Sequence, residues 1–430
     1  MLLGLLGSVN ANESWYQMGG AIEHGASSSV SLSHNGVSKP RVAVGSRGFA
    51  RVYELTYNGS WSQLGNDLKS SESSVSLSDM SVSLSGYGNF LAVGDPFSDA
   101  NGTRSGQVRV YNLDDNTNLW VPVGNAIVGP SEEKFGRDVQ LSGYPSSSGG
   151  FSGDAYLAVL GNYRARVYKY SSSTVSWEQL LTDLTATGAG WSSPGFIDSF
   201  SAYLPSQVTL SSSQGYIHMY TWTTNIYSNA VYEFWGAEDV IPKLSDPNGY
   251  SKELVTSTPM SSGRRVAVGY SARDAVGANS GQVRVYDVSL SSHSQVGSSI
   301  DGKAKDDYFG TEVSMTTDGT RIAVGAAGYP GYVQVLEYRE SPNAWVQLGE
   351  DISNVGYQVS LEKRSGEIIA VTTSNSVMVF RYGGAPSPPP HPPPPNPPPT
   401  TPPPSSSDAT SLNVCASSWA AVGISLMLAY

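Results

Sequence analysis

The sequence consists largely of seven copies of one unit, and this repetition constrains the fold more than any other feature. Each copy opens on a segment of the pattern W-x-x-x-G-x-x-I, whose first position holds, in order, Trp15, Trp61, Trp120, Trp177, Tyr232, His293 and Trp345. The copies start 46 to 61 residues apart, and the 368 residues from Trp15 to Tyr382 average about 53 per copy. Self-similarity at a period of this size is typical of propellers, solenoids and repeat arrays.

Every copy supplies four segments with the composition of short strands. The Trp segment is followed by V-S-L-S, L-A-V-G and V-R-V-Y segments, as in SVSLS at Ser81, FLAVG at Phe90 and QVRVY at Gln107. These segments are rich in β-branched and aromatic residues and alternate with a period of two, and none shows the 3.6-residue period of a helix. The pattern therefore predicts an all-β fold.

Four-stranded units at this period favour a β-propeller, in which four to eight blades are usual. We predict a single seven-bladed propeller of four-stranded blades over residues 12–383. The strand at Trp15 is expected to complete the last blade, formed by residues 355–382, and so to close the ring. Two seven-stranded sandwiches are the alternative, but they would leave the repeat period unexplained.

The repeat also predicts how neighbouring blades meet. In QVRVY, Val108 and Val110 should face the next blade while Arg109 points away. Each Trp should cover a blade edge with its large apolar ring. The Gly that ends L-A-V-G, such as Gly94, is expected to supply a positive φ that a residue with a Cβ resists.

Short phrases around these strands carry a family resemblance. They are Phe135-Gly136 and Phe309-Gly310 before V-S-L-S, Gly94-Asp95-Pro96 and Gly325-Ala326-Ala327 after L-A-V-G, and D-G-T-R-I-A-V-G at Asp318. They resemble the FG-GAP repeat, which builds the seven-bladed propeller of integrin α chains, and similar extracellular repeat proteins of algae and other protists. The resemblance covers roughly residues 15–383 and is weak in the fourth copy, where PSQVTLSSS at Pro205 replaces L-A-V-G. It implies cell-surface adhesion or ligand binding rather than a reaction.

Integrin FG-GAP blades often hold Ca²⁺ in a loop of the D-x-D-x-D-G type, and this sequence departs from that pattern. The nearest loop, DPFSDANG, offers Asp95, Asp99 and Asn101 at spacings of four and two, and SARDAVGANSG has only Asp274. Oxygen-rich loops suit Ca²⁺, but turn-forming Asp and Asn explain these residues. We predict no metal site and no cofactor.

A proline-rich segment follows the repeats. Fourteen of the 26 prolines lie between Pro386 and Pro404, and such a run forms an extended polyproline II spacer rather than a compact fold. We predict a disordered stalk over residues 384–407. Its composition resembles the hydroxyproline-rich glycoproteins of algal and plant walls, which implies hydroxylated and glycosylated prolines.

Residues 408–430 carry no charge after Asp408, and only Trp419 to Tyr430 is strongly apolar. Small residues, a polar spacer and an apolar end form the pattern of a glycosylphosphatidylinositol attachment signal, with Ser407 as the predicted lipidated residue. A weak transmembrane span and an artefactual end are the alternatives. A span would need about 20 apolar residues and flanking Lys or Arg. We therefore expect the protein to contact the membrane only through this anchor.

Residues 1–11 resemble the back half of a secretory signal, with an apolar start and the small-residue pair Val9-x-Ala11 but no positive charge. A truncated start would explain the missing charge. Three N-x-S/T acceptors, Asn12, Asn58 and Asn101, fit N-glycosylation of a secreted chain. The predicted location is extracellular, at the cell surface or cell wall.

Composition and motifs exclude several classes of function. The formal net charge of −11 leaves no Lys/Arg footprint for nucleic acid, and one cysteine excludes an intrachain disulfide framework. The five histidines form no catalytic signature. Adjacent carboxylates, Glu132 with Glu133 or Glu238 with Asp239, could flank a glycosidic bond but equally fit solvated loop ends. We predict no catalytic residue.

The stretch from Leu184 to Tyr250 departs most from the repeat and carries extra aromatic residues. Loops on one face of a repeat protein tolerate insertion and often bind ligands. The candidate ligand-binding residues are therefore Trp191, Phe196, Tyr203, Trp222 and Trp235. The alternative is that these rings repair the packing of a degenerate blade.

Together these features predict a non-catalytic cell-surface module that binds an extracellular protein or glycan and is displayed on a Pro-rich stalk. A propeller-based glycan hydrolase or lyase is one alternative, and carboxylates converging on the channel mouth would favour it. A structural wall or matrix glycoprotein is the other.

Overall fold

Every regular element in the described residues is a β-strand, as the repeat predicts. The computed structural model describes residues 14–24, 27–33, 39–70, 80–142, 155–162, 164–179, 184–185, 207–211, 217–224, 231–234, 253–256, 264–288, 293–355 and 358–383. The chain divides into two units, Met1–Ala385 and Pro386–Tyr430, and all described strands belong to the first.

The strands form antiparallel sheets that follow one another along the chain. Their inner strands are β3 (Ser27–Ser33), β7 (Ser81–Leu84), β12 (Asp138–Ser142), β20 (Glu253–Thr256), β25 (Phe309–Met315) and β30 (Val359–Leu361). Their second strands are β4 (Arg41–Ser46), β8 (Phe90–Asp95), β13 (Tyr156–Leu160), β17 (Gln207–Ser211), β21 (Arg264–Tyr270), β26 (Arg321–Ala326) and β31 (Ile368–Thr372).

The third and outer strands complete each sheet. The third strands are β5 (Phe49–Leu55), β9 (Gln107–Asp114), β14 (Arg164–Ser171), β18 (Ile217–Thr224), β22 (Gln282–Val288), β27 (Tyr332–Arg339) and β32 (Ser376–Gly383). The outer strands are β6 (Trp61–Lys69), β10 (Leu119–Pro122), β15 (Ser176–Gln179), β19 (Val231–Phe234), β23 (His293–Gln295), β28 (Ala344–Gln347) and β1 (Ser14–Gln17). Short strands also pair with third strands: β2 (Ile22–Glu23), β11 (Ile127–Val128), β16 (Leu184–Thr185), β24 (Ile300–Asp301) and β29 (Ile352–Ser353).

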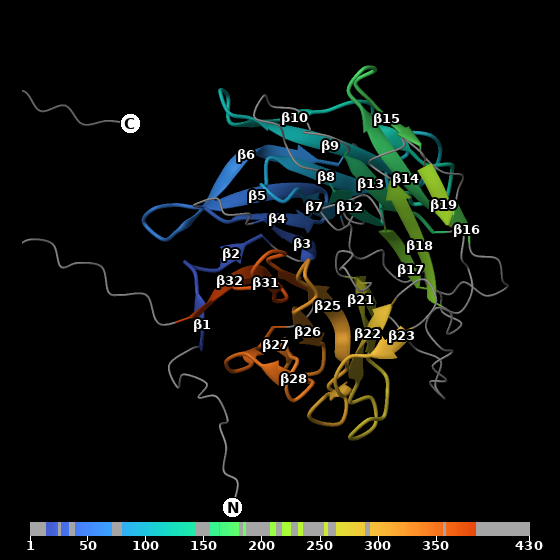
Figure 1. Ribbon diagram of the computed structural model, residues 1–430. Coiled ribbons are helices and arrows are strands. Elements are labelled where there is room, and N and C mark those ends of the chain that lie inside the picture. The colour runs from blue at the N-terminus through green and yellow to red at the C-terminus, as the bar shows by residue number, and fades with distance from the viewer. Residues whose placement is uncertain are drawn as a thin grey trace, which may run out of the picture. The chain divides into compact units, whose positions relative to one another are not determined.

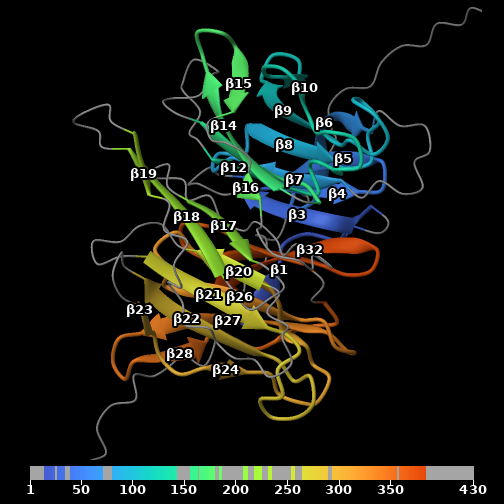
Figure 2. The same ribbon diagram turned by 90° about the vertical axis from the view of Figure 1, so that its right-hand side faces the viewer.

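The first three sheets contact one another in chain order, and so do the fourth to seventh, as the order of colours in Figure 1 shows. The last sheet returns to the first, because β30 and β31 contact β3. In the described residues the fourth sheet consists of β17, β18 and β19. Figure 2 shows this sheet beside the fifth, and β17 of the fourth sheet contacts β20 of the fifth.

The N-terminal strand belongs to the last sheet. β1 runs antiparallel to β32 and pairs Ser14 with Gly383 and Gln17 with Phe380. The resulting order β1-β32-β31-β30 is the four-stranded unit that the sequence predicts from Trp15 and residues 355–382. The first and last strands are thus joined by hydrogen bonds rather than by the chain.

The apolar core of the described part is divided among the junctions between consecutive sheets. Val108 and Val110 are fully buried against Phe135 and Val139 of the next sheet, while Arg109 is exposed. This confirms the orientation predicted for QVRVY. Because burying each Val contributes about 1.5 to 3 kcal/mol, the sheets that share these described junctions depend on one another for stability.

Serine hydroxyls connect the inner strands of neighbouring sheets. The middle Ser of V-S-L accepts a hydrogen bond from the backbone N–H of the Leu in the next copy. The observed pairs are Ser31 with Leu84, Ser83 with Leu141, Ser314 with Leu361 and Ser360 with Leu32, each at 3.0 Å. A buried N–H without a partner would be costly, so the recurring Ser satisfies a donor that the sheet itself leaves open.

The W-x-x-x-G pattern links the outer edges of neighbouring sheets. Each described indole N–H donates to a backbone carbonyl of the preceding copy: Trp61 to Met18, Trp120 to Leu64, Trp177 to Val123, Trp345 to Val296 and Trp15 to Leu348, at 2.7 to 3.1 Å. The glycine after each of these carbonyls has a φ of 68° to 83°. A Cβ there would lie 2.5 to 3.1 Å from the indole, so the ring packs flat only against glycine. The Trp does cover a sheet edge, as predicted.

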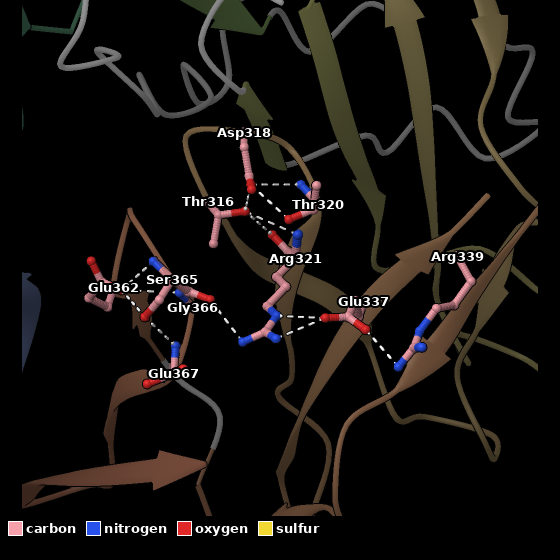
Figure 3. A network of polar contacts seen from close by, with 10 residues as sticks. All are labelled: Thr316, Asp318, Thr320, Arg321, Glu337, Arg339, Glu362, Ser365, Gly366 and Glu367. Atoms are coloured by element: carbon pink, nitrogen blue, oxygen red, sulfur yellow. Dashed lines mark hydrogen bonds and ion pairs between the residues drawn. The ribbon is translucent and has the colours of Figure 1, made fainter. Parts of the chain in front are cut away.

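Arginines at the start of second strands form a third link. Arg321 bonds Glu337 of its own sheet through Nε and Nη2, at 3.0 and 2.8 Å, and donates from Nη1 to the Ser365 carbonyl of the next sheet at 2.8 Å (Figure 3). Arg41 and Arg265 repeat this bridge to the carbonyls of Gly88 and Gly319. The ion pair within each sheet orients the guanidinium, and the bond from Nη1 to the carbonyl links that sheet to its neighbour.

The reason predicted for the glycine of L-A-V-G is wrong. Gly94 lies inside β8, and its φ is outside the left-handed region. A Cβ at Gly94 would instead lie 2.2 Å from the carbonyl oxygen of Gly136 in the next sheet, and one at Gly45 would lie 2.0 Å from that of Met80. The glycine is needed because two backbones approach closely there.

Candidate functional site

The antiparallel order sorts the connections onto two ends of the sheets. The loops between second and third strands lie at one end, together with the connections that lead into the next inner strand. We call this end the loop face. The connections from inner to second strands and from third to outer strands lie at the other end; most are short, but residues 143–155 between β12 and β13 are a longer one. The two long described second-to-third loops, residues 96–106 and 271–281, lie on the loop face, which makes it the place to look for a binding site.

Two pairs of loops on this face have the same backbone geometry. In the first pair, residues 96–106 and 129–136, the N–H groups of Glu132, Lys134 and Phe135 donate to the carbonyls of Thr103, Arg104 and Ser105. In the second, residues 271–281 and 302–310, those of Asp306, Tyr308 and Phe309 donate to Ala278, Asn279 and Ser280. Phe135 and Phe309, of the two Phe-Gly dipeptides, are fully buried and anchor the two pairs.

The acidic residues of these loops shape the loops themselves. Asp99 accepts a hydrogen bond from the N–H of Arg104 at 2.7 Å, and Asp274 accepts one from Asn279 at 2.8 Å. Both are side-chain-to-backbone bonds across a turn. Within the described ranges, no three His, Cys, Asp or Glu side chains are grouped as metal ligands.

Three loops of the fifth and sixth sheets form the candidate site: residues 271–281, 302–308 and 327–331. Gly328 N–H donates to the Asp307 carbonyl at 2.8 Å, which joins two of them. The Asp307 carboxylate accepts from the N–H groups of Lys303 and Ala304 and from the Tyr332 hydroxyl, at 2.7 to 3.0 Å. Burial raises the pKa of Tyr332, which keeps this hydroxyl protonated as a donor. The loops are therefore rigidly braced.

Apolar side chains are exposed on these braced loops. Tyr329 is fully exposed, and Val276 and Tyr308 are exposed on the two adjacent loops. On the same loops, the Asn279 amide donates to Asp306 at 3.0 Å, and the Lys305 ammonium lies 3.7 Å from the same carboxylate. Aromatic surface next to hydrogen-bonding groups is the usual composition of a small-ligand site.

Sequence reasoning did not select Tyr308 or Tyr329. The signal available was a difference between the two matching loop pairs. Tyr308 occupies the position that Lys134 occupies in the first pair, and both residues have a positive φ, 53° and 49°. A bulky residue in this conformation is uncommon, so the position was worth noting.

The aromatic residues chosen from the irregular stretch are not tested. Trp191, Phe196, Tyr203 and Trp235 lie outside the described residues, and Trp222 lies in β18, whose side chains are not described. They remain predictions.

The predicted modification sites fall partly within the described chain. Asn58 lies in an exposed turn between β5 and β6, where its side-chain oxygen accepts a bond from the Ser60 hydroxyl at 2.7 Å. Asn101 is also exposed, on the loop face, and its amide donates to the Gly129 carbonyl at 3.1 Å. Asn12 and Ser407 lie outside the described residues.

His24 lies where the last sheet meets the first. It follows β2 and is buried, its Nδ1 lies 3.3 Å from the Ser46 hydroxyl of β4, and its Nε2 has no hydrogen-bond partner in the described structure. Burial lowers the pKa of His24 from its usual value of 6.5. Burial therefore favours the neutral ring at the junction between the last sheet and the first.

We expect acid to weaken this junction. Below pH 6.5 the unfolded chain binds a proton at His24 that the folded chain resists, so the free energy of unfolding falls as the pH drops through that value. The melting temperature should decrease between pH 7.5 and 5, and by a smaller amount in a His24→Gln variant, which cannot titrate. Parallel pH profiles for the two proteins would show that His24 is not responsible.

Comparison with known proteins reveals likeness in structure only. No family model and no curated protein matches the chain. A putative 6-phosphogluconolactonase from Bacteroides fragilis matches 87% of this chain and 92% of its own, with a TM-score of 0.52 and 12% identity. Raptor from Chaetomium thermophilum matches 88% of this chain and 30% of its own, with a TM-score of 0.52 and 11% identity. A chain of the mitotic checkpoint complex gives a TM-score of 0.49 over 89% of this chain and 98% of its own, at 15% identity.

Together with the successive antiparallel sheets, these likenesses define an all-β protein of the β-propeller class. At such low identity they establish the fold alone. Among the described residues, no helix is long and apolar enough to cross a membrane.

Proposed function

We propose that the protein is a seven-bladed, FG-GAP-like propeller, closed by its N-terminal strand, that acts as a non-catalytic binding or adhesion module at the cell surface. The observation that carries this proposal is the position of the two ends of the propeller. Ser14 and Gly383 pair with each other at the end of the sheets opposite the loop face. A tether at either end therefore leaves the loop face, with its exposed tyrosines, directed away from the attachment.

The remaining segments complete the proposal. Residues 1–11 act as a secretory signal, residues 384–407 as an extended Pro-rich stalk, and residues 408–430 as a glycosylphosphatidylinositol signal with Ser407 as the attachment residue. The partner is an extracellular protein or glycan.

A glycan hydrolase or lyase receives less support from the described residues. Such an enzyme needs two carboxylates that converge on the substrate. Of the adjacent pair in the first loop pair, Glu132 is exposed, whereas Glu133 is buried where a Cβ at Gly161 would touch it. Of this pair only Glu132 is therefore exposed to a substrate, and Glu238 and Asp239 lie outside the described residues.

Two measurements on the full chain test the proposal. Phosphatidylinositol-specific phospholipase C should release the protein from intact cells. Beads coated with the protein should adhere to cells or extracellular matrix, and antibodies against loop-face peptides should block adhesion more than antibodies against the Tyr57 turn on the opposite end. Retention after the lipase contradicts the anchor. Absence of adhesion contradicts the binding function and favours a structural glycoprotein.

A further inference from the structure

Two tyrosines of the candidate site, Tyr308 and Tyr329, present aromatic surface to solvent. The other aromatic residues of the same loops and strands, Phe309, Tyr270 and Tyr332, are buried. Tyr329 is exposed over its whole surface, and Tyr308 projects from the loop joined to it through the Gly328–Asp307 hydrogen bond. Two aromatic rings are thus carried on adjacent, braced segments of backbone.

The backbone conformation at Tyr308 is set by the loop geometry, whereas the side chain at this position differs between the two loop pairs. The φ of 53° at Tyr308 is in the left-handed region, where Gly or Asn is far easier to accommodate. The matching position of the first loop pair holds Lys134 in the same conformation, so the backbone requirement is common to both pairs and the tyrosine is particular to one.

The polar groups beside the rings identify the class of ligand. Asp306 and Lys305 are exposed and Asn279 is half-buried; the Asn279 amide donates to the Asp306 carboxylate, and the Lys305 ammonium lies 3.7 Å from it. A vicinal diol can donate to the carboxylate and accept from the ammonium or amide, while the apolar face of a sugar ring covers an aromatic ring.

The same groups argue against two other occupants. The centre of a protein interface is depleted of charged residues, but here the exposed Lys305 and Asp306 lie on the same loop as Tyr308. An acidic polysaccharide would need net positive charge, whereas the lysines of these loops are paired: Lys305 with Asp306, and Lys303 with Asp351.

We propose that the loops at residues 271–281, 302–308 and 327–331 bind a neutral oligosaccharide, with Tyr308 and Tyr329 stacking on its sugar rings and Asp306, Asn279 and Lys305 bonding its hydroxyls. The inference rests on the proposed binding function and names the ligand class of its site.

The test uses the full chain and an array of neutral oligosaccharides of glucose, galactose, mannose and xylose, together with sulfated counterparts. We expect a neutral oligosaccharide to bind, and Tyr329→Ala to weaken its affinity about tenfold. Tyr308→Gly should weaken it similarly while leaving the melting temperature unchanged or higher, because the ring and the strain are removed together. A variant that keeps its melting temperature but binds more weakly has lost ligand contacts and not its fold.

The first loop pair supplies a matched control. Lys134→Gly removes the same strain at the equivalent position, so it should raise the melting temperature as Tyr308→Gly does and leave the affinity unchanged. The inference is overturned if Tyr308→Gly binds the oligosaccharide as tightly as the parent protein, or if Lys134→Gly loses as much affinity as Tyr308→Gly. It is also overturned if the protein prefers the sulfated sugars or binds nothing on the array. If beads still adhere to cells while no oligosaccharide binds, the proposed binding function stands and the ligand is a protein.

Discussion

Trp15→Ala will lower the free energy of unfolding by about 3 kcal/mol and will expose the whole of β1 to hydrogen exchange. The indole of Trp15 donates to the Leu348 carbonyl, packs over Gly349 and lies 5.3 Å from the ring of Tyr382, measured between centroids. These contacts help to hold β1, which with the following β2 joins strands β30 to β32 from the opposite end of the repeats. Loss of the indole should therefore free β1 and weaken the junction between the last sheet and the first.

Trp120→Ala provides the comparison. Trp120 makes the same contact with Leu64 and Gly65, but it lies within a continuous stretch of chain. Both variants should lose stability, and only Trp15→Ala should lose exchange protection in β1 and β32 before global unfolding. Denaturant melts and hydrogen–deuterium exchange measure the two effects. Equal protection of β1 in both variants would show that the ring does not depend on this strand.

Gly94→Ala will destabilise the protein by about 3 kcal/mol or more, although it adds a single methyl group to a strand. The new Cβ would lie 2.2 Å from the Gly136 carbonyl oxygen and 2.4 Å from the Ser81 hydroxyl. Relief requires the backbones of two neighbouring sheets to move apart, which also weakens the packing of Val108 and Val110. A large fall in melting temperature is expected.

Gly20→Ala is the control for this substitution. Gly20 is exposed, and a Cβ there meets no atom within 4 Å. Its melting temperature should stay within about a degree or two of the parent, since surface changes away from special features are nearly neutral. If Gly94→Ala has the same melting temperature as Gly20→Ala, the two sheets are not in the close contact described.

The repeat made the strands predictable, because period and composition act locally. FLAVG at Phe90 and QVRVY at Gln107 open β8 and β9, and the place of Trp15 in the last sheet followed from the order of segments. The role of Gly94 could not be predicted in the same way. It depends on the distance to another sheet, which no local pattern contains.

The weak fourth copy is a second instructive case. Leu181 replaces the glycine of W-x-x-x-G, and the next copy has Tyr232 where the indole would pack against it. The two changes fall on the two partners of one expected contact. Read with the contacts seen elsewhere, they indicate that the pattern is a relation between copies and not a property of each. Tyr308 and Tyr329 take no part in this contact between copies, so the repeat pattern could not single them out.

The pairing of Ser14 with Gly383 also determines how the molecule would respond to a mechanical load. A pull on the C-terminal end acts along β32, which is hydrogen-bonded to β31 on one side and to β1 on the other. Antiparallel hydrogen bonds run perpendicular to the strands, so such a pull shears both rows at once instead of opening them one by one. Shear is the direction in which a sheet resists extension best, and a strand at the edge would lack half of that resistance.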